Sequence, residues 1–310
     1  MIGCDGSEFD LKAYLEAEGR AVEAALERAA CVFGEHLTSE SAAAARHGML
    51  SGGKRLRPIL CVTAWRACRD GAGTHPLPDA LHDLAVGLEV IHAYSLIHDD
   101  LPSMDNAMLR RGAPTTHRVH GVDAATLGGV AMIPLAARGV LEAGETLGLS
   151  PDVTAECARI LLGAAGAGGM VGGQGLDLLG EGRTLGESEL SELHRHKTGA
   201  LLTAALEVGA VAAGAAPEVR EALRSYGEQI GLAFQIADDV LDATATAEEL
   251  GKRPSDDELD KSTYVALHGL EGARRRARDE VEGARAALDA VGLESPALHA
   301  IADYIVTRRR

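Results

Sequence analysis

The chain has 310 residues, a formal net charge of −16 at pH 7, and a composition that is 46% hydrophobic but only 3% aromatic. Such a net charge argues against a nucleic-acid-binding surface. It does not exclude an anionic substrate, because bound metal ions invert the local charge. Ala and Leu dominate and strand-like runs of Val, Ile, Thr and aromatic residues are scarce, so we expect an all-α fold. No composition break marks a second domain, and we expect a single domain over residues 1–310.

Cysteine usage and the N-terminal sequence bear on the compartment. The five cysteines show no metal or disulfide spacing, and an odd, scattered set fits a reducing cytoplasm. The first ten residues, MIGCDGSEFD, are acidic and lack the apolar core of a signal peptide. No run of about 18 uncharged apolar residues occurs, so we expect no membrane span. We therefore predict a cytoplasmic protein.

Apolar residues recur at helical spacing along most of the chain. They predict roughly ten or more helices, the clearest over residues 9–33, 39–50, 58–69, 78–100, 122–148, 151–172, 188–214, 217–243 and 262–290. The helices over 122–148 and 151–172 are rich in Ala, Gly and Leu, and we expect both to be buried. The polar segment 244–262, broken by Pro254, is predicted to be a loop.

Three carboxylates follow the apolar helix over 78–100. The stretch from His92 to Gly112 reads HAYSLIHDDLPSMDNAMLRRG and places Asp99, Asp100 and Asp105 together, with Arg110 and Arg111 directly after. Acids against apolar sequence repel one another and lose hydration, so a cation is expected among them. Carboxylate oxygens suit Mg²⁺, which takes one or two carboxylates and completes its shell with water and phosphate. The alternative is a solvated helix end.

A second acid cluster lies in residues 234–242, FQIADDVLD. Asp238 and Asp242 are four residues apart and Asp239 and Asp242 three apart, so all three reach one face of a helix. The two clusters, each at the end of an apolar helical run, suggest two walls of one metal site.

Basic residues stand in specific local settings despite the acidic composition. Lys54, Arg55 and Arg57 follow Gly52 and Gly53, and glycines allow close approach of the backbone to a phosphate, which Arg grips with paired hydrogen bonds. Further basic groups are Arg110, Arg111, Lys197 beside Thr198, Lys252 and Lys261. Any one of these alone is typical of a solvated surface charge. Together with the acids they indicate a cavity for two polyanions, one held through metals and one by direct salt bridges.

Seven motifs in order resemble those of the trans-isoprenyl diphosphate synthases (polyprenyl synthetases), most closely the bacterial farnesyl diphosphate synthases. They are GGKRLRP at 52–58, HAYSLIHDDLPSMD at 92–105, LRRGAPTTH at 109–117, GMVGGQGLDL at 169–178, HKTGALL at 196–202, FQIADDVLD at 234–242, and LGK with KSTY at 250–252 and 261–264. The resemblance covers nearly the whole chain. It implies a single polyprenyl synthetase domain, a bundle of helices around a deep central cavity of the isoprenoid synthase type, usually a homodimer.

The resemblance also implies roles for individual residues. Mg²⁺, three ions with substrate bound, would be held by Asp99, Asp105 and Asp238, with Asp100 alongside. Residues implied to contact the allylic diphosphate are Arg110, Lys197, Thr198, Gln235, Lys252 and Lys261. Residues implied to bind isopentenyl diphosphate are Lys54, Arg57, His92 and Arg111. The implied reaction is head-to-tail (1′-4) prenyl transfer, in which Asp99, Asp100, Asp105, Lys197 and Asp238 act in catalysis.

Tyr94 and Ser95 lie about one turn before Asp99 and are candidates for the floor of a product tunnel. The bulky Tyr94 ring favours the fifteen-carbon product, farnesyl diphosphate. A plain core role for Tyr94 fits the spacing as well, and geranyl or geranylgeranyl diphosphate remains the alternative product.

The chain departs from the family pattern at three places. Asn106, Ala107 and Met108 replace the usual acidic run, Gly128–Ala131 lacks the usual acid, and the Lys252–Lys261 segment is one residue short with Asp260 where Gly is common. The first departure leaves the key metal-binding acids in place. The second bears on the local helix structure, and the third bears on the loop that closes the site. A non-catalytic subunit of the same fold and a terpene cyclase are the rival interpretations. The intact acid motifs argue against the first, and the Lys54, Arg57 and His92 set against the second.

Overall fold

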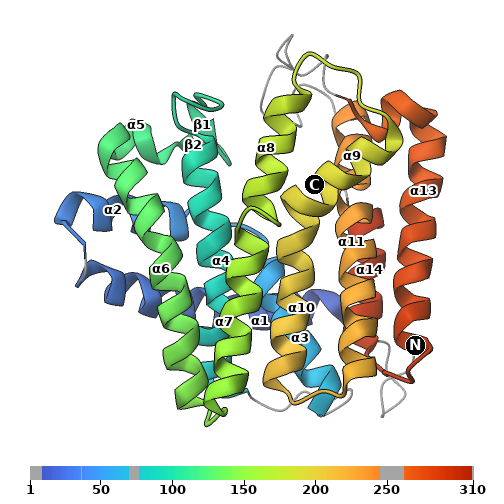
Figure 1. Ribbon diagram of the computed structural model, residues 1–310, viewed down its shortest axis with the longest axis horizontal. Coiled ribbons are helices and arrows are strands. Elements are labelled where there is room, and N and C mark those ends of the chain that lie inside the picture. Colours follow the sequence, from blue (N-terminus) through green and yellow to red (C-terminus); the bar gives the residue numbers. More distant parts are fainter. Residues whose placement is uncertain (1–8, 36, 70–76, 245–261, 309–310) are drawn as a thin grey trace. The chain divides into compact units, whose positions relative to one another are not determined.

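The structure, a computed structural model, describes residues 9–35, 37–69, 77–244 and 262–308 (Figure 1). The all-α class is confirmed, with more than ten helices in these ranges. The strands in the described ranges are β1 (Leu109–Arg110) and β2 (Ala113–Pro114), which form one antiparallel pair. The chain divides into two compact units, and the expected single domain over 1–310 stays a prediction.

The first unit comprises residues 12–62 and 74–161. Its helices are α1 (Leu11–Gly34), α2 (Ser39–Met49), the start of α3 (Leu56–Arg69), α4 (Asp79–Asp99), α5 (Thr116–His120), α6 (Val122–Thr146) and most of α7 (Pro151–Ala165). Helix α4 forms the core and lies beside α6, as Figure 1 shows. A Cβ on Gly87 of α4 would lie 2.7 Å from the Val140 side chain of α6, so the glycine permits this close packing.

Helices α4 and α6 are both long and apolar enough to cross a membrane by length and composition alone. They differ in burial, because 78% of the apolar window of α4 is buried and only 33% of that of α6. Leu127, Val130 and Leu141 of α6 are exposed large apolar side chains. The expectation that the 122–148 helix is buried is therefore wrong for its outer face. The apolar residues of α6 extend around more of the helix surface than the neighbouring helices of the unit bury.

The second unit comprises residues 1–11, 63–73 and 162–310. Its helical elements are α8 (Met170–Gly180), α9 (Glu187–His194), the π-turn η1 (Arg195–Gly199), α10 (Ala200–Ala212), α11 (Pro217–Thr244), α13 (Tyr264–Asp289) and α14 (Pro296–Thr307). Helix α11 packs against α10, α13 and α14. Its buried Tyr226 donates a hydrogen bond to the Leu298 carbonyl of α14 at 2.7 Å. Helix α11 is thus the central helix of this unit.

Three predicted helices are interrupted in the structure. The helix expected over 262–290 is kinked at Gly269, where φ is +68° and ψ is 168°. The helix expected over 151–172 ends at Ala165, and α8 begins at Met170 after a glycine-rich turn. A Cβ on Gly169 would lie 2.1 Å from the Ala164 carbonyl oxygen, so this turn requires glycine. The helix expected over 188–214 is broken at η1, where the Ala200 N–H bonds to the Arg195 carbonyl five residues back. Such π-turns occur frequently at functional sites.

Candidate active site

The first acid motif lies at the C-terminal end of α4, in the first unit. The N–H of Asp105 donates to the Asp99 carbonyl at 2.9 Å, which folds the Leu-Pro segment back against the helix end. Asp99 is partly exposed and Asp105 exposed, whereas Asp100 is buried. The loop therefore presents two accessible carboxylates and one enclosed carboxylate.

The enclosed carboxylate, Asp100, is paired with Arg110. Arg110 Nε lies 2.9 and 2.8 Å from the two Asp100 oxygens, and Nη2 lies 2.7 Å from Oδ1. Burial lowers the pKa of Arg110, but the hydrogen bond and charge of Asp100 outweigh it and the pKa is raised overall. Asp100 thus fixes Arg110, a predicted substrate contact, beside the motif.

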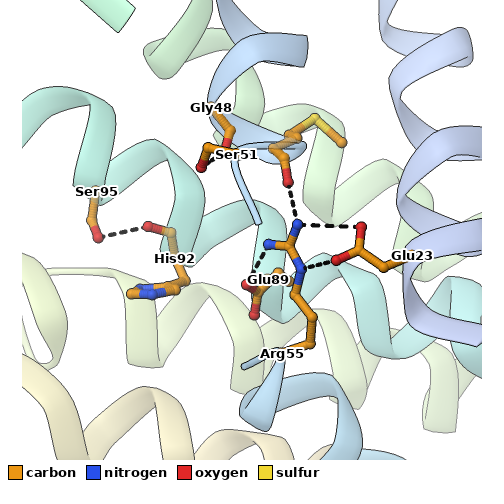
Figure 2. A network of polar contacts seen from close by, with 8 residues as sticks. Glu23, Gly48, Ser51, Arg55, Glu89, His92 and Ser95 are labelled. Carbon is orange, nitrogen blue, oxygen red and sulfur yellow. Dashed lines mark hydrogen bonds and ion pairs between the residues drawn. The ribbon is translucent and has the colours of Figure 1, made fainter. Parts of the chain in front are cut away.

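The loop before α3 is anchored by Arg55 (Figure 2). Its guanidinium donates to Glu23 Oε1 at 2.7 Å, to Glu89 Oε1 of α4 at 2.9 Å and to the Met49 carbonyl at 2.9 Å. Arg55 has a φ of +50°, a left-handed conformation that this network holds in place. Arg55 and Glu89 therefore tie the loop to α4, a role that sequence spacing alone did not reveal.

Four arginines of this unit interact electrostatically and form an arginine cluster, defined as Arg55, Arg57, Arg110 and Arg111. Burial, partly offset by Glu89, lowers the pKa of Arg57, and burial is also the main cause that lowers the pKa of Arg111. In the described part of the chain, Arg57 Nε is buried without a hydrogen-bond partner. Arg57 is partly exposed and Arg111 is exposed, so the positive charge that exceeds its local counter-charge is accessible to an anion.

His92 and Gly53 shape this cluster. Burial, followed by the charges of the arginines, lowers the pKa of His92 well below its usual value, so the ring is neutral at pH 7. Gly53 has a φ of +139°, and a Cβ there would lie 2.5 Å from Arg111 Nη1. Only glycine lets the Arg111 guanidinium lie against the loop backbone. Arg57, His92 and Arg111 are three of the four residues that the resemblance implies for one binding set, and they share this electrostatic environment. The fourth, Lys54, is exposed on the loop before α3.

The predicted tunnel residues lie on α4 next to this cluster. Tyr94 is buried and meets the His98 ring edge-on at 5.6 Å, and the Ser95 hydroxyl donates to the His92 carbonyl at 2.9 Å. The altered Gly128–Ala131 segment does not disturb α6, which continues through it. A Cβ on Gly128 would lie 2.8 Å from the Ser41 carbonyl oxygen, and one on Gly129 2.4 Å from His98 Nε2. The glycines permit close contact with α2 and α4.

The second acid motif lies on α11, in the second unit. Asp239 Oδ2 accepts from the N–H of Tyr264, the first residue of α13, at 2.7 Å. Burial, together with the charges of Asp238 and Asp242, raises the pKa of Asp239 to about 7 even though this hydrogen bond lowers it. Asp238 accepts from Arg308 at 2.6 Å and Asp242 is exposed. Asp239 therefore anchors α13, whereas Asp238 faces a cation.

Lys197 lies in the π-turn of the same unit. Its Nζ donates to Asp177 Oδ2 of α8 at 2.5 Å, and a Cβ on Gly173 would lie 2.2 Å from the Lys197 backbone nitrogen. Helix α8 thus presses on η1 and orients Lys197. Thr198 and Gln235 are partly exposed in this unit. Asp177 was not singled out from sequence, although it belongs to the quoted GMVGGQGLDL motif.

The structure leaves part of the predicted site open. Asp99 and Asp238 lie in different units, each described separately, so the two-walled metal site stays a prediction. Lys252 and Lys261 lie outside the described residues. Within the described ranges, no three His, Cys, Asp or Glu side chains are gathered to hold a metal on their own. The accessible carboxylates still suit Mg²⁺, which needs only one or two when water and phosphate supply the rest.

Comparisons with known proteins agree with the motif resemblance. A family model described as polyprenyl synthetase matches residues 39–290. Farnesyl diphosphate synthase from Escherichia coli (strain K12) is 43% identical over 270 residues, covering 86% of this chain and 88% of the relative. Geranylgeranyl pyrophosphate synthase 9, chloroplastic, from Arabidopsis thaliana is 39% identical over 311 residues, covering 98% and 83%. A crystal structure of an FPP/GFPP synthase from Zymomonas mobilis has a TM-score of 0.79 and 36% identity, covering 95% of this chain and 98% of that one.

Proposed function

The chain belongs to the polyprenyl synthetase family, and on that premise we propose that it joins an allylic diphosphate to isopentenyl diphosphate. The allylic substrate is dimethylallyl or geranyl diphosphate, and the product is a short-chain trans-prenyl diphosphate, farnesyl diphosphate. The similarity to synthases named for farnesyl and geranylgeranyl products supports a short chain. The observation that carries the proposal is the arginine cluster beside the accessible carboxylates Asp99, at the end of α4, and Asp105, just after it.

The arginine cluster is proposed as the isopentenyl diphosphate site. Lys54, Arg57 and Arg111 would contact its phosphate oxygens, and Arg pairs with such oxygens through two parallel hydrogen bonds. His92 is neutral, so it would serve as a hydrogen-bond partner rather than as a cation. The excess of positive charge over the nearby carboxylates supports an anionic ligand here.

The allylic diphosphate is proposed to lie beside the two acid motifs. Asp99, Asp105 and Asp238 would hold Mg²⁺, which when bound supplies positive charge to the diphosphate. Lys197, Thr198, Gln235 and Arg110 are proposed to contact the same group, with Lys252 and Lys261. Lys197 and Arg110 are held by Asp177 and Asp100, so their positive charges are fixed before substrate arrives. Preorganised charge of this kind stabilises a leaving group as its charge develops.

The chemistry requires no protein nucleophile. The allylic C–O bond breaks and its electron pair leaves with the diphosphate. The double bond of isopentenyl diphosphate then attacks the allylic cation to form the new C–C bond, and loss of a proton to the departing diphosphate restores a double bond. The protein positions the two substrates and keeps water from the cation.

We also propose a cytoplasmic homodimer. The four cysteines in the described ranges, Cys31, Cys61, Cys68 and Cys157, are free thiols, which suits a reducing compartment. The exposed apolar side chains of α6 supply a surface that a second copy would cover. Light scattering after size exclusion is expected to give the mass of two chains. Leu127→Glu is expected to give one, whereas Val32→Glu on α1 leaves two.

The decisive assay supplies dimethylallyl and radiolabelled isopentenyl diphosphates with Mg²⁺ and separates the products by chromatography. Farnesyl diphosphate is the expected product. Asp99→Ala and Asp238→Ala are each expected to lower kcat/KM by about 10²–10³-fold. Asp152→Ala removes the same charge at the exposed start of α7 and is expected to leave kcat/KM unchanged. Absence of product from folded protein would refute the proposal and favour a non-catalytic subunit.

A further inference from the structure

Arg308 contacts the first acid of the second motif. It follows α14 directly, with extended backbone at φ −60° and ψ 148°, and its side chain returns to α11. Its Nη2 donates to Asp238 Oδ1 at 2.6 Å and to the Phe234 carbonyl at 3.2 Å. Both residues lie in the second unit, so the contact does not depend on the placement of the first.

Several contacts fix the position of the Arg308 guanidinium against α11. Its Cζ lies 3.8 Å from the centre of the Phe234 ring, and its Nε donates to the Ile305 carbonyl at 3.2 Å. The Arg308 side chain is 5% exposed and that of Asp238 39% exposed. Arg suits this position because its planar guanidinium stacks on an aromatic ring while the edge of the group donates hydrogen bonds. Phe234 and Asp238 are one helical turn apart, so a single turn of α11 supplies both contacts.

This contact places the Arg308 guanidinium at Asp238, where the proposed function requires Mg²⁺. A divalent ion and the guanidinium cannot both lie against Asp238 Oδ1, because like charges at that distance repel. In this structure Arg308 therefore pairs with the carboxylate that is proposed to ligate Mg²⁺. The partial exposure of Asp238 leaves a route by which a metal can approach it.

We propose that Arg308 is a positioning residue that holds the Asp238 carboxylate while no metal is bound and competes with the divalent cation for Oδ1. The inference rests on the proposed function, in which Asp238 is a ligand. Metal with diphosphate would displace the guanidinium from Oδ1. Loss of the Arg308 charge should therefore tighten metal binding, whereas a residue that only stabilises the fold would leave metal affinity unchanged.

The test measures binding of Mn²⁺ to the full chain in the presence of inorganic diphosphate, from the electron paramagnetic resonance signal of free Mn²⁺. Arg308→Gln is expected to lower the Mn²⁺ dissociation constant about tenfold, the scale of one charge-assisted hydrogen bond. Arg308→Lys keeps the charge but loses the planar stack, and a smaller decrease is expected. Arg274→Gln is the control, because it removes an exposed positive charge of α13 in the same unit and no change is expected.

Two outcomes would overturn the inference alone. They are equal Mn²⁺ affinity in Arg308→Gln and Arg274→Gln, and weaker binding in Arg308→Gln. If Arg308→Gln does not fold, equal affinity of Arg308→Lys and wild type would also overturn it. Asp238→Asn separates the test of Asp238 as a metal ligand from the test of competition by Arg308. Loss of Mn²⁺ binding in this variant is the expected result, whereas unchanged binding would remove Asp238 from the metal site and refute both the ligand assignment and the inference.

Discussion

The Arg55–Glu89 ion pair offers the sharpest test of how the anion-binding loop is held. Both side chains are 3% exposed, and their atoms Nη1 and Oε1 lie 2.9 Å apart. Glu89 Oε2 already lacks a hydrogen-bond partner in the described part of the chain. In Arg55→Met, a substitution of similar length, the buried carboxylate would lose this ion pair.

The expected cost follows from that burial. Removing one partner of a buried ion pair costs about 3–5 kcal/mol, because the other charge remains desolvated. The contact of Arg55 with Glu23 adds little, since the Glu23 side chain is 44% exposed and exposed pairs contribute about 0–1 kcal/mol. We therefore expect Arg55→Met to lower the free energy of unfolding by about 3–5 kcal/mol. Arg55→Met combined with Glu89→Leu should recover most of the loss, because no buried charge remains.

Urea denaturation followed by circular dichroism measures both variants. Arg46→Met is the matched control, because Arg46 pairs with Glu27 in the same unit where both side chains are about half exposed. A change within about 0.5 kcal/mol is expected for this control. If Arg55→Met matched Arg46→Met, or if the double variant were no more stable than Arg55→Met, the reasoning would be refuted. The KM for isopentenyl diphosphate should rise in Arg55→Met, because the loop that leads into α3, the helix whose first turn carries Arg57, loses its anchor.

Three further predictions concern other residues. Tyr94→Ala should lengthen the product if the buried ring closes the tunnel, and an unchanged product on chromatography would assign Tyr94 to the core alone. Gly53→Ala should raise the KM for isopentenyl diphosphate with a smaller effect on kcat, because the added Cβ displaces Arg111; unaltered kinetics would contradict this. Burial lowers the pKa of His194 from 6.5 to about 4. The unfolded chain therefore takes up the proton first, and the free energy of unfolding should fall by about 3 kcal/mol between pH 6.5 and 4. His194→Phe should remove most of that fall in acid titrations of stability, and an unchanged slope would show that other groups cause it.

Helix identity was predictable where apolar spacing was continuous. The helices expected over 78–100 and 217–243 correspond to α4 and α11 within about one residue. The helix expected over 262–290 corresponds to α13 in extent, but α13 is kinked at Gly269, where φ is +68°. The kink at Gly269 was not predicted, nor were the breaks at Gly166–Gly169 and at η1. The break at Gly166–Gly169 depends on a close backbone contact across a turn, and the break at η1 on the close packing of α8 against it. The spacing of apolar residues reveals neither contact. The exposed face of α6 was missed for a related reason, because an apolar helix does not reveal what covers it.

The sequence by itself determined the all-α class, the family and the two acid motifs, because these depend on residue type and short spacing. The tertiary structure decided what each acid contacts. Arg110 encloses Asp100, the α13 N–H holds Asp239 from 25 residues away, and Arg308 reaches Asp238 from 70 residues away. It also showed that Arg55 and Glu89 anchor the loop that carries Lys54 and leads into α3, where Arg57 lies. Such partners are set by helix packing, which brings distant residues together, and no local spacing in the sequence encodes them.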